Sequence, residues 1–300
     1  MEKKKSTTNL EVIKMIRLCA FADEADKMVE GQIRALKKNN IDLIELRGLD
    51  GTNISKLTED EARRYAKRFE ESGIKVWSIG SPLGKVKITE DFEEYKKLVR
   101  HVCRLAKIFG TDKIRMFSFH HAYESEDKLM ENLRAMVAIA NEEGVVLYHE
   151  NEKAIFGDTC ERVLKIMDKV EGLKFIYDPA NFLEVGEKAD TTLDALHAKT
   201  DYFHIKDVIA ESGTLVPAGC GDGKIDELIA RISPESDTVM TLEPHLKVFE
   251  GFAEIDGTEM KNKYNFASNE EAFDAAVNAL KGLLCDAGYK YDEKKRGYVK

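Results

Sequence analysis

The chain has 300 residues, of which 43% are hydrophobic and 34% charged, and this composition is typical of a globular protein with a sizeable core. No apolar run approaches the roughly 20 residues that a membrane-spanning helix needs, so we expect no membrane span. The formal net charge of −9 argues against a protein that binds nucleic acid along a basic surface.

The predicted elements alternate between short apolar runs and longer amphipathic segments. We expect strands at 16–21, 42–46, 75–79, 113–117, 145–150, 173–178, 202–206 and 238–243. We expect helices at 26–38, 58–72, 89–109, 126–143, 158–170, 191–200, 225–232 and 269–287. A helix therefore follows each strand, which gives eight strand–helix units.

Local signals mark the ends of several predicted helices. Thr58 is followed three residues later by Glu61, which predicts a capping box at the start of the second helix. Gly73 directly follows that helix, where a left-handed residue often ends a helix. Asp158 is the expected N-cap of the helix at 158–170.

The strands themselves predict the fold. They are short and mostly continuously apolar, which indicates strands covered on both faces, as in a parallel sheet. Their starts recur about every 26–38 residues, the length of one βα unit. A doubly wound sheet would more often show a glycine-rich turn after the first strand, whereas this chain has AFADEAD. We therefore predict an α/β fold with a single (β/α)8 TIM barrel over about 16–287.

No linker rich in Pro, Gly or Ser divides the chain, so we expect one domain over residues 1–300. The barrel would have a short N-terminal extension at 1–14 and a polar tail at 288–300 that we expect to be exposed or frayed. Five widely spaced cysteines without a CxxC motif favour a reducing, cytoplasmic location. No apolar segment follows the lysines at 3–5, so a secretory signal is not expected.

In a TIM barrel, side chains at the carboxyl ends of the strands meet at one rim. Strands five to eight each end in an ionisable residue, and these residues are Glu150, Asp178, His204 and Glu243. Any one of them alone is ordinary, since a turn aspartate or a buried histidine is common. Four in succession favour a shared cation, because crowded carboxylates otherwise raise one another's pKa.

The donor set predicts the kind of cation. Three carboxylates and one imidazole form a hard, oxygen-rich set that favours Mn²⁺ or Mg²⁺ and tolerates Co²⁺ or Zn²⁺. Four protein ligands in an octahedral site leave two positions, which suit a carbonyl and the adjacent hydroxyl of a sugar. We therefore expect one divalent metal ion and a small-molecule carbohydrate substrate.

The same residues lie in motifs that resemble a known family. The motifs are HENE (149–152), YDPAN (177–181), HIKD (204–207), PAGCGDGKID (217–226), TLEPH (241–245) and SIGSPLGK (78–85). Over about 16–285 they resemble the xylose isomerase-like barrel superfamily, also called the sugar phosphate isomerase/epimerase family. The resemblance implies metal binding by Glu150, Asp178, His204 and Glu243, with the two glutamates acting as acid and base in the family's epimerases. Asn181 stands where some members carry a substrate-contacting histidine, so it is a substrate-binding candidate that departs from the ketose 3-epimerase pattern.

Other polar residues near the rim are candidates for substrate binding. Alternation places Glu45 and Arg47 on one inward face, either as a fixed ion pair or with Arg47 orienting the substrate. Lys85 follows a loop that could reach over the barrel mouth, and the alternative is a solvated surface lysine. Lys206 shares the face of the histidine ligand, where it would bind a substrate hydroxyl or a ligand carboxylate. Asp207 is expected to bind loop groups or substrate.

Two further features are expected to be structural. His149 should point away from the rim site, because adjacent strand residues face opposite sides. Gly219, Gly221 and Gly223 form a GxGxG stretch without the GK[ST] of a P-loop, which favours a flexible rim loop over a phosphate cradle.

These observations predict a divalent-metal-dependent isomerase or epimerase of a sugar, sugar phosphate or related polyol, acting by proton transfer next to a carbonyl. The alternative is a metal-dependent lyase that dehydrates a cyclic polyol such as an inosose. An endonuclease that cuts at abasic sites would need more rim histidines, and a non-catalytic sugar-binding barrel would be expected to lose a ligand. We expect no nucleic acid or membrane partner, and a homo-oligomer by analogy with related barrels.

Overall fold

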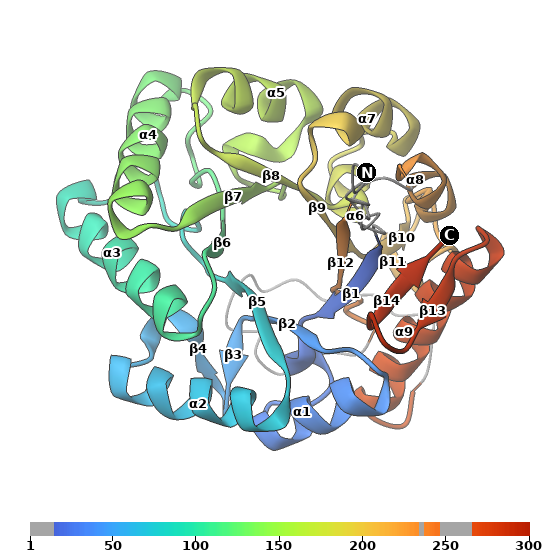
Figure 1. Ribbon diagram of the computed structural model, residues 1–300. Coiled ribbons are helices and arrows are strands. Elements are labelled where there is room, and N and C mark those ends of the chain that lie inside the picture. Colours follow the sequence, from blue (N-terminus) through green and yellow to red (C-terminus); the bar gives the residue numbers. More distant parts are fainter. Residues whose placement is uncertain (1–14, 234–236, 247–265) are drawn as a thin grey trace, which may run out of the picture.

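The structure is a computed structural model that describes residues 15–233, 237–246 and 266–300. Eight parallel strands form a closed barrel, because β12 pairs with β1 as well as with β9 (Figure 1). The predicted TIM barrel is confirmed, and the predicted extension at 1–14 lies outside the described residues. In chain order the barrel strands are β1 (Ile16–Ala20), β2 (Leu43–Leu46), β5 (Lys75–Gly80), β6 (Lys113–Met116), β7 (Val146–Glu150), β8 (Lys174–Tyr177), β9 (Tyr202–Ile205) and β12 (Thr238–Leu242).

Helices connect the strands and form an outer ring around the barrel (Figure 1). One of them, α6 (Pro179–Glu184), was not expected from the sequence pattern. Pro179 occupies its first position, where the missing N–H leaves no hydrogen bond unmade. Among the described residues, no helix combines the length and the hydropathy that a transmembrane span requires. The other helices are α1 (Val29–Lys38), α2 (Glu59–Ser72), α3 (Phe92–Ile108), α4 (Glu126–Glu143), α5 (Cys160–Lys169), α7 (Ala189–Leu196), α8 (Ile225–Arg231) and α9 (Asn269–Asp286).

The helix ends show which local signals were correct. At the start of α2, Thr58 Oγ1 accepts a hydrogen bond from the Glu61 N–H (3.3 Å), and the Glu61 carboxylate accepts one from the Thr58 N–H (2.9 Å). Gly73 ends the helix with a φ of 76°, a conformation that glycine adopts without strain. Asp158 is not the N-cap of α5, because Thr159 takes that position and Asp158 lies in the short 3₁₀ turn before it.

Two of the three apolar clusters among the described residues pack against the barrel strands on their outer and inner sides. The larger one fills the space between strands and helices, and it includes the buried rings of Phe69, Phe182 and Phe273. Burial of one such ring contributes about 1.5–3 kcal/mol relative to an exposed position. The smaller cluster, which includes Ile176 and Tyr202, fills the barrel interior below the carboxyl ends of the strands. The site therefore rests on a packed interior and not on an open channel.

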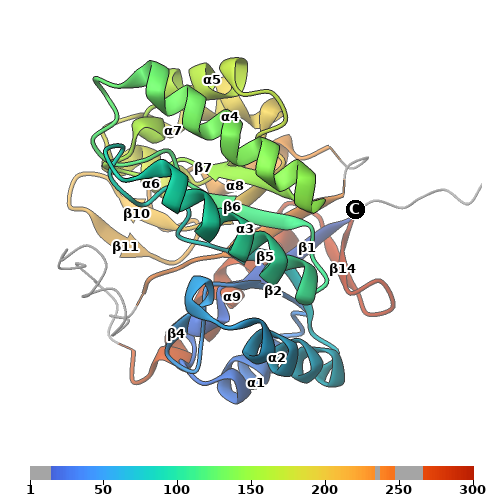
Figure 2. The ribbon, with the colours of Figure 1, turned by 90° about the vertical axis from the view of Figure 1, so that its left-hand side faces the viewer.

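The C-terminal residues form a hairpin of β13 (Lys290–Asp292) and β14 (Gly297–Val299). Tyr298 of β14 pairs in antiparallel register with Ile16, the first residue of β1, and is only 4% exposed. Figure 2 shows the hairpin beside β1, at the end of the barrel opposite to the carboxyl ends of the strands. The tail at 288–300 is therefore not frayed, although about half of its residues are exposed as expected. Its two strands have only three residues each, which is too short for a clear strand pattern in the sequence.

Candidate metal centre

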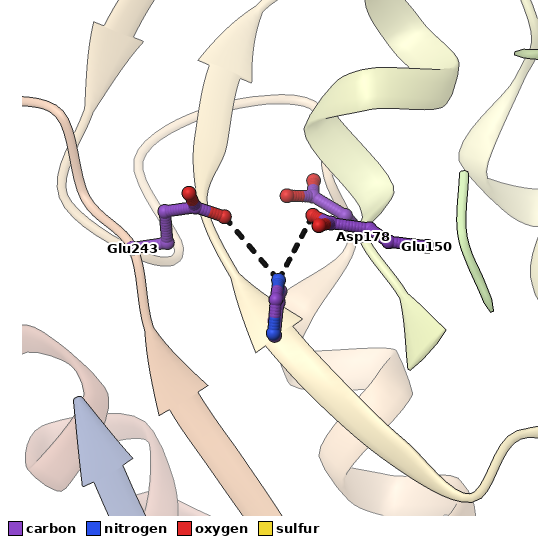
Figure 3. A group of neighbouring side chains, drawn as sticks. Glu150, Asp178 and Glu243 are labelled. Atoms are coloured by element: carbon purple, nitrogen blue, oxygen red, sulfur yellow. Dashed lines mark hydrogen bonds and ion pairs between the residues drawn. The ribbon is translucent and has the colours of Figure 1, made fainter. Parts of the chain in front are cut away.

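Four side chains converge at the carboxyl ends of neighbouring strands. Glu150 is the last residue of β7, Asp178 directly follows β8, His204 lies in β9 and Glu243 directly follows β12. One ligand atom from each residue lies within 4.8 Å of the others, and none of the four residues is more than 5% exposed. In Figure 3, Glu150 and Glu243 approach from either side of one imidazole, with Asp178 above it. The structure thus brings together the four ligand candidates that the sequence indicated.

The donor set and its buried atoms fit a divalent cation. His204 Nδ1 lies 2.9 Å from Glu150 Oε1 and 3.3 Å from Glu243 Oε2. Within the described part of the chain, the buried Asp178 Oδ2 and Glu243 Oε2 make no hydrogen bond. Each of these oxygens instead faces one side-chain nitrogen, Lys206 Nζ at 3.2 Å and His204 Nδ1 at 3.3 Å, and a divalent cation could bind between them. Hard oxygen donors with one imidazole suit Mn²⁺ or Mg²⁺ and tolerate Co²⁺ or Zn²⁺.

The charges in this cluster depend strongly on one another. Burial raises the pKa of Asp178, Lys206 lowers it and Glu150 raises it further, so that it reaches about 7. Burial would also raise the pKa of Glu243, but Lys206 and His204 hold it well below its ordinary value. Burial lowers the pKa of His204, yet Glu150 raises it well above its ordinary value. In the metal-free protein, a proton on His204 therefore balances part of the negative charge that a divalent ion would balance.

Asp178 is both the N-cap of α6 and a member of the four-residue cluster. Its Oδ1 caps α6 by accepting a hydrogen bond from the Asn181 N–H (3.1 Å). Its own N–H donates to Asn151 Oδ1 (2.9 Å), and the Asn151 amide donates back to the Asp178 carbonyl oxygen (2.8 Å). These contacts fix the residue through its backbone and one oxygen, which leaves Oδ2 for the cluster.

Lys206 and Asn181 lie beside Asp178. Lys206 Nζ donates to Asn181 Oδ1 (2.7 Å) and lies 3.2 Å from Asp178 Oδ2. The Asn181 amide donates to the carbonyl oxygen of Asn151 (2.8 Å), so this side chain is engaged within the protein. Burial would lower the pKa of Lys206, but Asp178 raises it well above its ordinary value, so Lys206 is an ammonium. The sequence predicted that Lys206 would bind either a substrate hydroxyl or a ligand carboxylate, and the structure shows its contact with the carboxylate of Asp178.

A buried carboxylate from β2 contacts the far side of the imidazole. Glu45 Oε2 lies 3.2 Å from His204 Nε2, and the carboxylate also accepts hydrogen bonds from Tyr202 Oη and Thr241 Oγ1, each at 3.0 Å. A ring that offers Nδ1 to a cation carries its proton on Nε2, where it can donate to Glu45. The ion pair expected between Glu45 and Arg47 is not formed, because Arg47 lies beyond the end of β2 and reaches the segment after β1.

Arg47 is a bridge between that segment and Glu243. It donates to both oxygens of Asp23 (2.9 Å each), and its Nη1 donates to Glu243 Oε1 (3.0 Å). Glu24 accepts a further hydrogen bond from Nη2 (3.2 Å) and lies 2.9 Å from His245 Nδ1. The guanidinium is thus held by three carboxylates, one of which belongs to a ligand candidate, and a contact of Arg47 with substrate stays a prediction.

Arg115 of β6 was not singled out as a site residue by the sequence, although it contacts two of the ligand candidates. Its Nη1 donates to Glu150 Oε2 (3.1 Å) and lies 3.7 Å from Glu243 Oε1. The guanidinium also stacks over the rings of Phe21 and Phe117, 4.9 Å from each centroid. An arginine inside a predicted apolar strand is rare, and that signal could have identified it.

Lys85 comes from the loop after β5. Its Nζ donates to Glu152 Oε2 (2.8 Å) and lies 4.4 Å from the centroid of the Phe117 ring. Burial would raise the pKa of Glu152, but Lys85 lowers it, so that it reaches about 2. The loop therefore does reach toward the residues that follow β7, and Lys85 is an ion-pair partner there and not a solvated lysine.

The glycine-rich segment after β11 (Thr214–Val216) wraps around Asp207, the first residue of β10 (Asp207–Ile209). The Asp207 carboxylate accepts hydrogen bonds from the N–H groups of Gly219 (2.8 Å), Gly221 (3.0 Å) and Gly223 (2.9 Å), and from its neighbour Val208 (2.9 Å). A Cβ at Gly221 would lie 2.4 Å from Asp207 Oδ1, so the close approach requires glycine. Asp207 thus binds loop groups, and the loop is tied to it instead of being free.

His149 faces away from the cluster, as the strand alternation predicts. Its Nε2 lies 2.9 Å from Ser118 Oγ, and its ring lies nearly parallel to that of Phe175, with 6.4 Å between centroids. Burial lowers its pKa to about 3, so the ring is neutral. These contacts are those of a residue that packs β7 against its surroundings.

Comparison with known families matches this architecture. A model described as the xylose isomerase-like TIM barrel matches residues 33–281. The chain belongs to this family. A search among curated protein sequences finds no match for this xylose isomerase-like barrel.

Solved structures share the fold at low sequence identity. The probable 3-DHS dehydratase AsbF of Bacillus anthracis is 17% identical with a TM-score of 0.68, covering 89% of this chain and 98% of that one. A structure described as the IOLI protein with a binding zinc atom is 16% identical with a TM-score of 0.68, covering 90% and 99%. A D-allulose 3-epimerase from Methylomonas sp. in complex with D-allulose is 13% identical with a TM-score of 0.68, covering 90% and 96%. At these identities the likeness establishes the fold.

Proposed function

We propose that this protein is a divalent-metal-dependent isomerase or epimerase of a sugar or related polyol. The observation that carries the proposal is the convergence of three carboxylates and one imidazole at the carboxyl ends of four barrel strands. Membership of the xylose isomerase-like family supports it, as does the fold likeness to D-allulose and L-ribulose 3-epimerases. The residues of this chain carry the chemical argument.

Glu150, Asp178, His204 and Glu243 would hold the ion, which would polarise a substrate carbonyl and align its neighbouring hydroxyl. Mn²⁺ or Mg²⁺ is the proposed ion, because three of the four donors are carboxylates. The zinc atom bound in one structure of the same fold supports a divalent ion in general.

Glu150 and Glu243 are the proposed acid and base. They approach the centre from different strands, and a hydrogen bond from Arg115 or Arg47 fixes one oxygen of each carboxylate. One carboxylate would take the proton from the carbon next to the carbonyl, and the other would return a proton to the opposite face. The Lys206 ammonium, 3.2 Å from Asp178 Oδ2, would bind a substrate hydroxyl or a developing oxyanion.

The test is a pair of variants, Glu150→Gln and Glu243→Gln. Glutamine keeps the side-chain length but loses the negative charge and the ability to take a proton. We expect each variant to slow deuterium uptake from D₂O at the carbon next to the carbonyl by about 10²–10⁴-fold, and to reduce the bound metal found by elemental analysis. Glu142→Gln, on the exposed surface of α4, is the control and should behave as wild type. Full turnover in either site variant would overturn the proposal.

A metal-dependent lyase is the second candidate. The ammonium of Lys206 favours it, because a cation beside the site could protonate a departing hydroxyl, and the likeness to a probable dehydratase is consistent with it. A substrate that loses 18 mass units during deuterium exchange would identify a lyase, whereas exchange without mass loss would identify an isomerase or epimerase. A cytoplasmic location and a homo-oligomer stay predictions from the sequence.

A further inference from the structure

The charged residues around the candidate metal centre form a set that we call the rim cluster. With neutral histidines, its seven carboxylates and four permanent cations leave three negative charges, of which a divalent ion would neutralise two. The carboxylates are those of Asp23, Glu24, Glu45, Glu150, Glu152, Asp178 and Glu243, and the cations are those of Arg47, Lys85, Arg115 and Lys206.

Each cation of the rim cluster is already bound by a carboxylate of the chain. The shortest charge contacts are 2.9 Å for Arg47 with Asp23, 2.8 Å for Lys85 with Glu152, and 3.1 Å for Arg115 with Glu150. The fourth, between Lys206 and Asp178, is 3.2 Å. An anionic group on a substrate would therefore have to displace a carboxylate or lie against one. Displacement would break an existing ion pair, and close approach would bring two negative charges together.

The glycine-rich segment offers no alternative anion site. Successive backbone N–H groups spaced by glycines are the usual cradle for a phosphate. Here the N–H groups of Gly219, Gly221 and Gly223 are bound by the Asp207 carboxylate, at 2.8–3.0 Å. The chain thus supplies its own anion to the cradle.

We propose that the site selects an uncharged, unphosphorylated polyol with a carbonyl group and discriminates against its phosphate ester. The inference rests on the proposed function and narrows its substrate class. Hydroxyl groups are compatible with a rim of this composition, because they can donate to the carboxylates and accept from Lys206 without adding charge. A phosphate dianion would enter a region that stays about one charge negative even with a divalent ion bound.

The first experiment compares matched substrates on the metal-loaded full chain. Deuterium uptake next to the carbonyl is followed by NMR for D-fructose against D-fructose 6-phosphate, and for D-ribulose against D-ribulose 5-phosphate. We expect kcat/KM to be at least about tenfold higher for the neutral member of any pair that reacts. Faster exchange of the phosphate ester would overturn this inference and leave the proposed function standing. No exchange in any pair would count against the proposed function and the inference together.

The second experiment frees the ammonium of Lys85 from its carboxylate partner, so that it can bind an anion. Glu152→Gln removes the partner charge of Lys85 at a residue that is partly accessible, so the fold should tolerate it. Sulfate is the probe, because it is a tetrahedral dianion that does not precipitate Mn²⁺. We expect sulfate to compete with the neutral substrate at a concentration about tenfold lower in Glu152→Gln than in wild type, with Glu152→Asp close to wild type. Equal inhibition of wild type and Glu152→Gln would contradict the proposal.

Discussion

The two halves of the barrel contribute differently to the same cluster. Strands β7, β8, β9 and β12 place the four ligand candidates. Glu45 lies in β2, Arg47 directly follows β2, and Arg115 lies in β6. Each of these residues contacts an atom of a ligand candidate, and that atom faces away from the centre. The first half of the barrel therefore orients the ligand candidates that the second half carries. The difference indicates that metal binding should depend on both halves, but to different degrees.

The largest effect is expected in the half that carries the ligands. Asp178→Asn keeps a good N-cap for α6, because asparagine caps helices as well as aspartate does, but it removes a charge from the centre. We expect metal affinity to fall more than about 100-fold, since losing only a hydrogen-bond partner of a ligand already costs about 10–100-fold. Isothermal titration with Mn²⁺ measures it, and circular dichroism checks the fold. An unchanged affinity for Mn²⁺ would contradict the assignment of the ligands to the second half of the barrel.

A smaller effect on metal affinity is expected from the supporting half. Glu45→Leu removes the acceptor of the His204 Nε2–H, and we expect metal affinity to fall about 10–100-fold. Glu45→Gln still offers a carbonyl oxygen and should recover part of the loss. The ¹⁵N shifts of the His204 ring in the metal-free protein report its pKa, which burial lowers and Glu45 raises, so we expect this pKa to fall in Glu45→Leu. An unchanged pKa of His204 in Glu45→Leu would show that Glu45 does not act on the ring.

Arg115→Met tests orientation separately from metal binding. The variant keeps much of the packing against Phe21 and Phe117 but cannot donate to Glu150. We expect kcat to fall about tenfold while one metal ion per chain is retained, because a charge-assisted hydrogen bond contributes about 1.5–3 kcal/mol. Steady-state kinetics and elemental analysis on one sample separate the two readouts. Loss of the metal together with the activity would place Arg115 with the ligand half.

The smallest effect on metal affinity is expected at Tyr202, whose hydroxyl donates a hydrogen bond to Glu45 and not to a ligand candidate. Tyr202→Phe removes one of the hydrogen bonds to Glu45 and leaves those from His204 and Thr241. We expect metal affinity to change by about fivefold or less, because a hydrogen bond of this kind contributes about 1 kcal/mol. The same titration with Mn²⁺ measures it. A loss as large as that of Glu45→Leu would mean that the whole buried network acts as one unit.

The features that the sequence predicted well have local causes. Continuous apolar runs, a capping box at Thr58 and a terminal glycine at Gly73 are properties of short segments, and they were sufficient to indicate the barrel. The convergence of the four ligand candidates followed, because a barrel aligns the carboxyl ends of its strands. The helix α6 also had local signals, Asp178 and Pro179, but an Asp-Pro pair reads equally as a turn.

The features that the sequence missed depend on contacts between distant segments. Arg47 binds Glu243, which is 196 residues away, and Glu45 binds His204, which is 159 residues away. Which partner a buried charge takes depends on side-chain reach across the closed barrel, and alternation along one strand does not contain that information. The same holds for Asp207, whose partners are 12–16 residues along in a loop without regular periodicity.

The closure of the barrel has a consequence for folding. β1 pairs with β12 and with the C-terminal hairpin, and the Met15 N–H donates to Asp237, 222 residues away. Contacts of such sequence separation form slowly, and during synthesis one edge of β1 has no partner until nearly the whole chain has been made. Glu243 directly follows the closing strand, so the candidate metal centre is complete only when the barrel is closed. Metal loading should therefore follow folding, and a nascent chain that ends before β12 should not bind the ion.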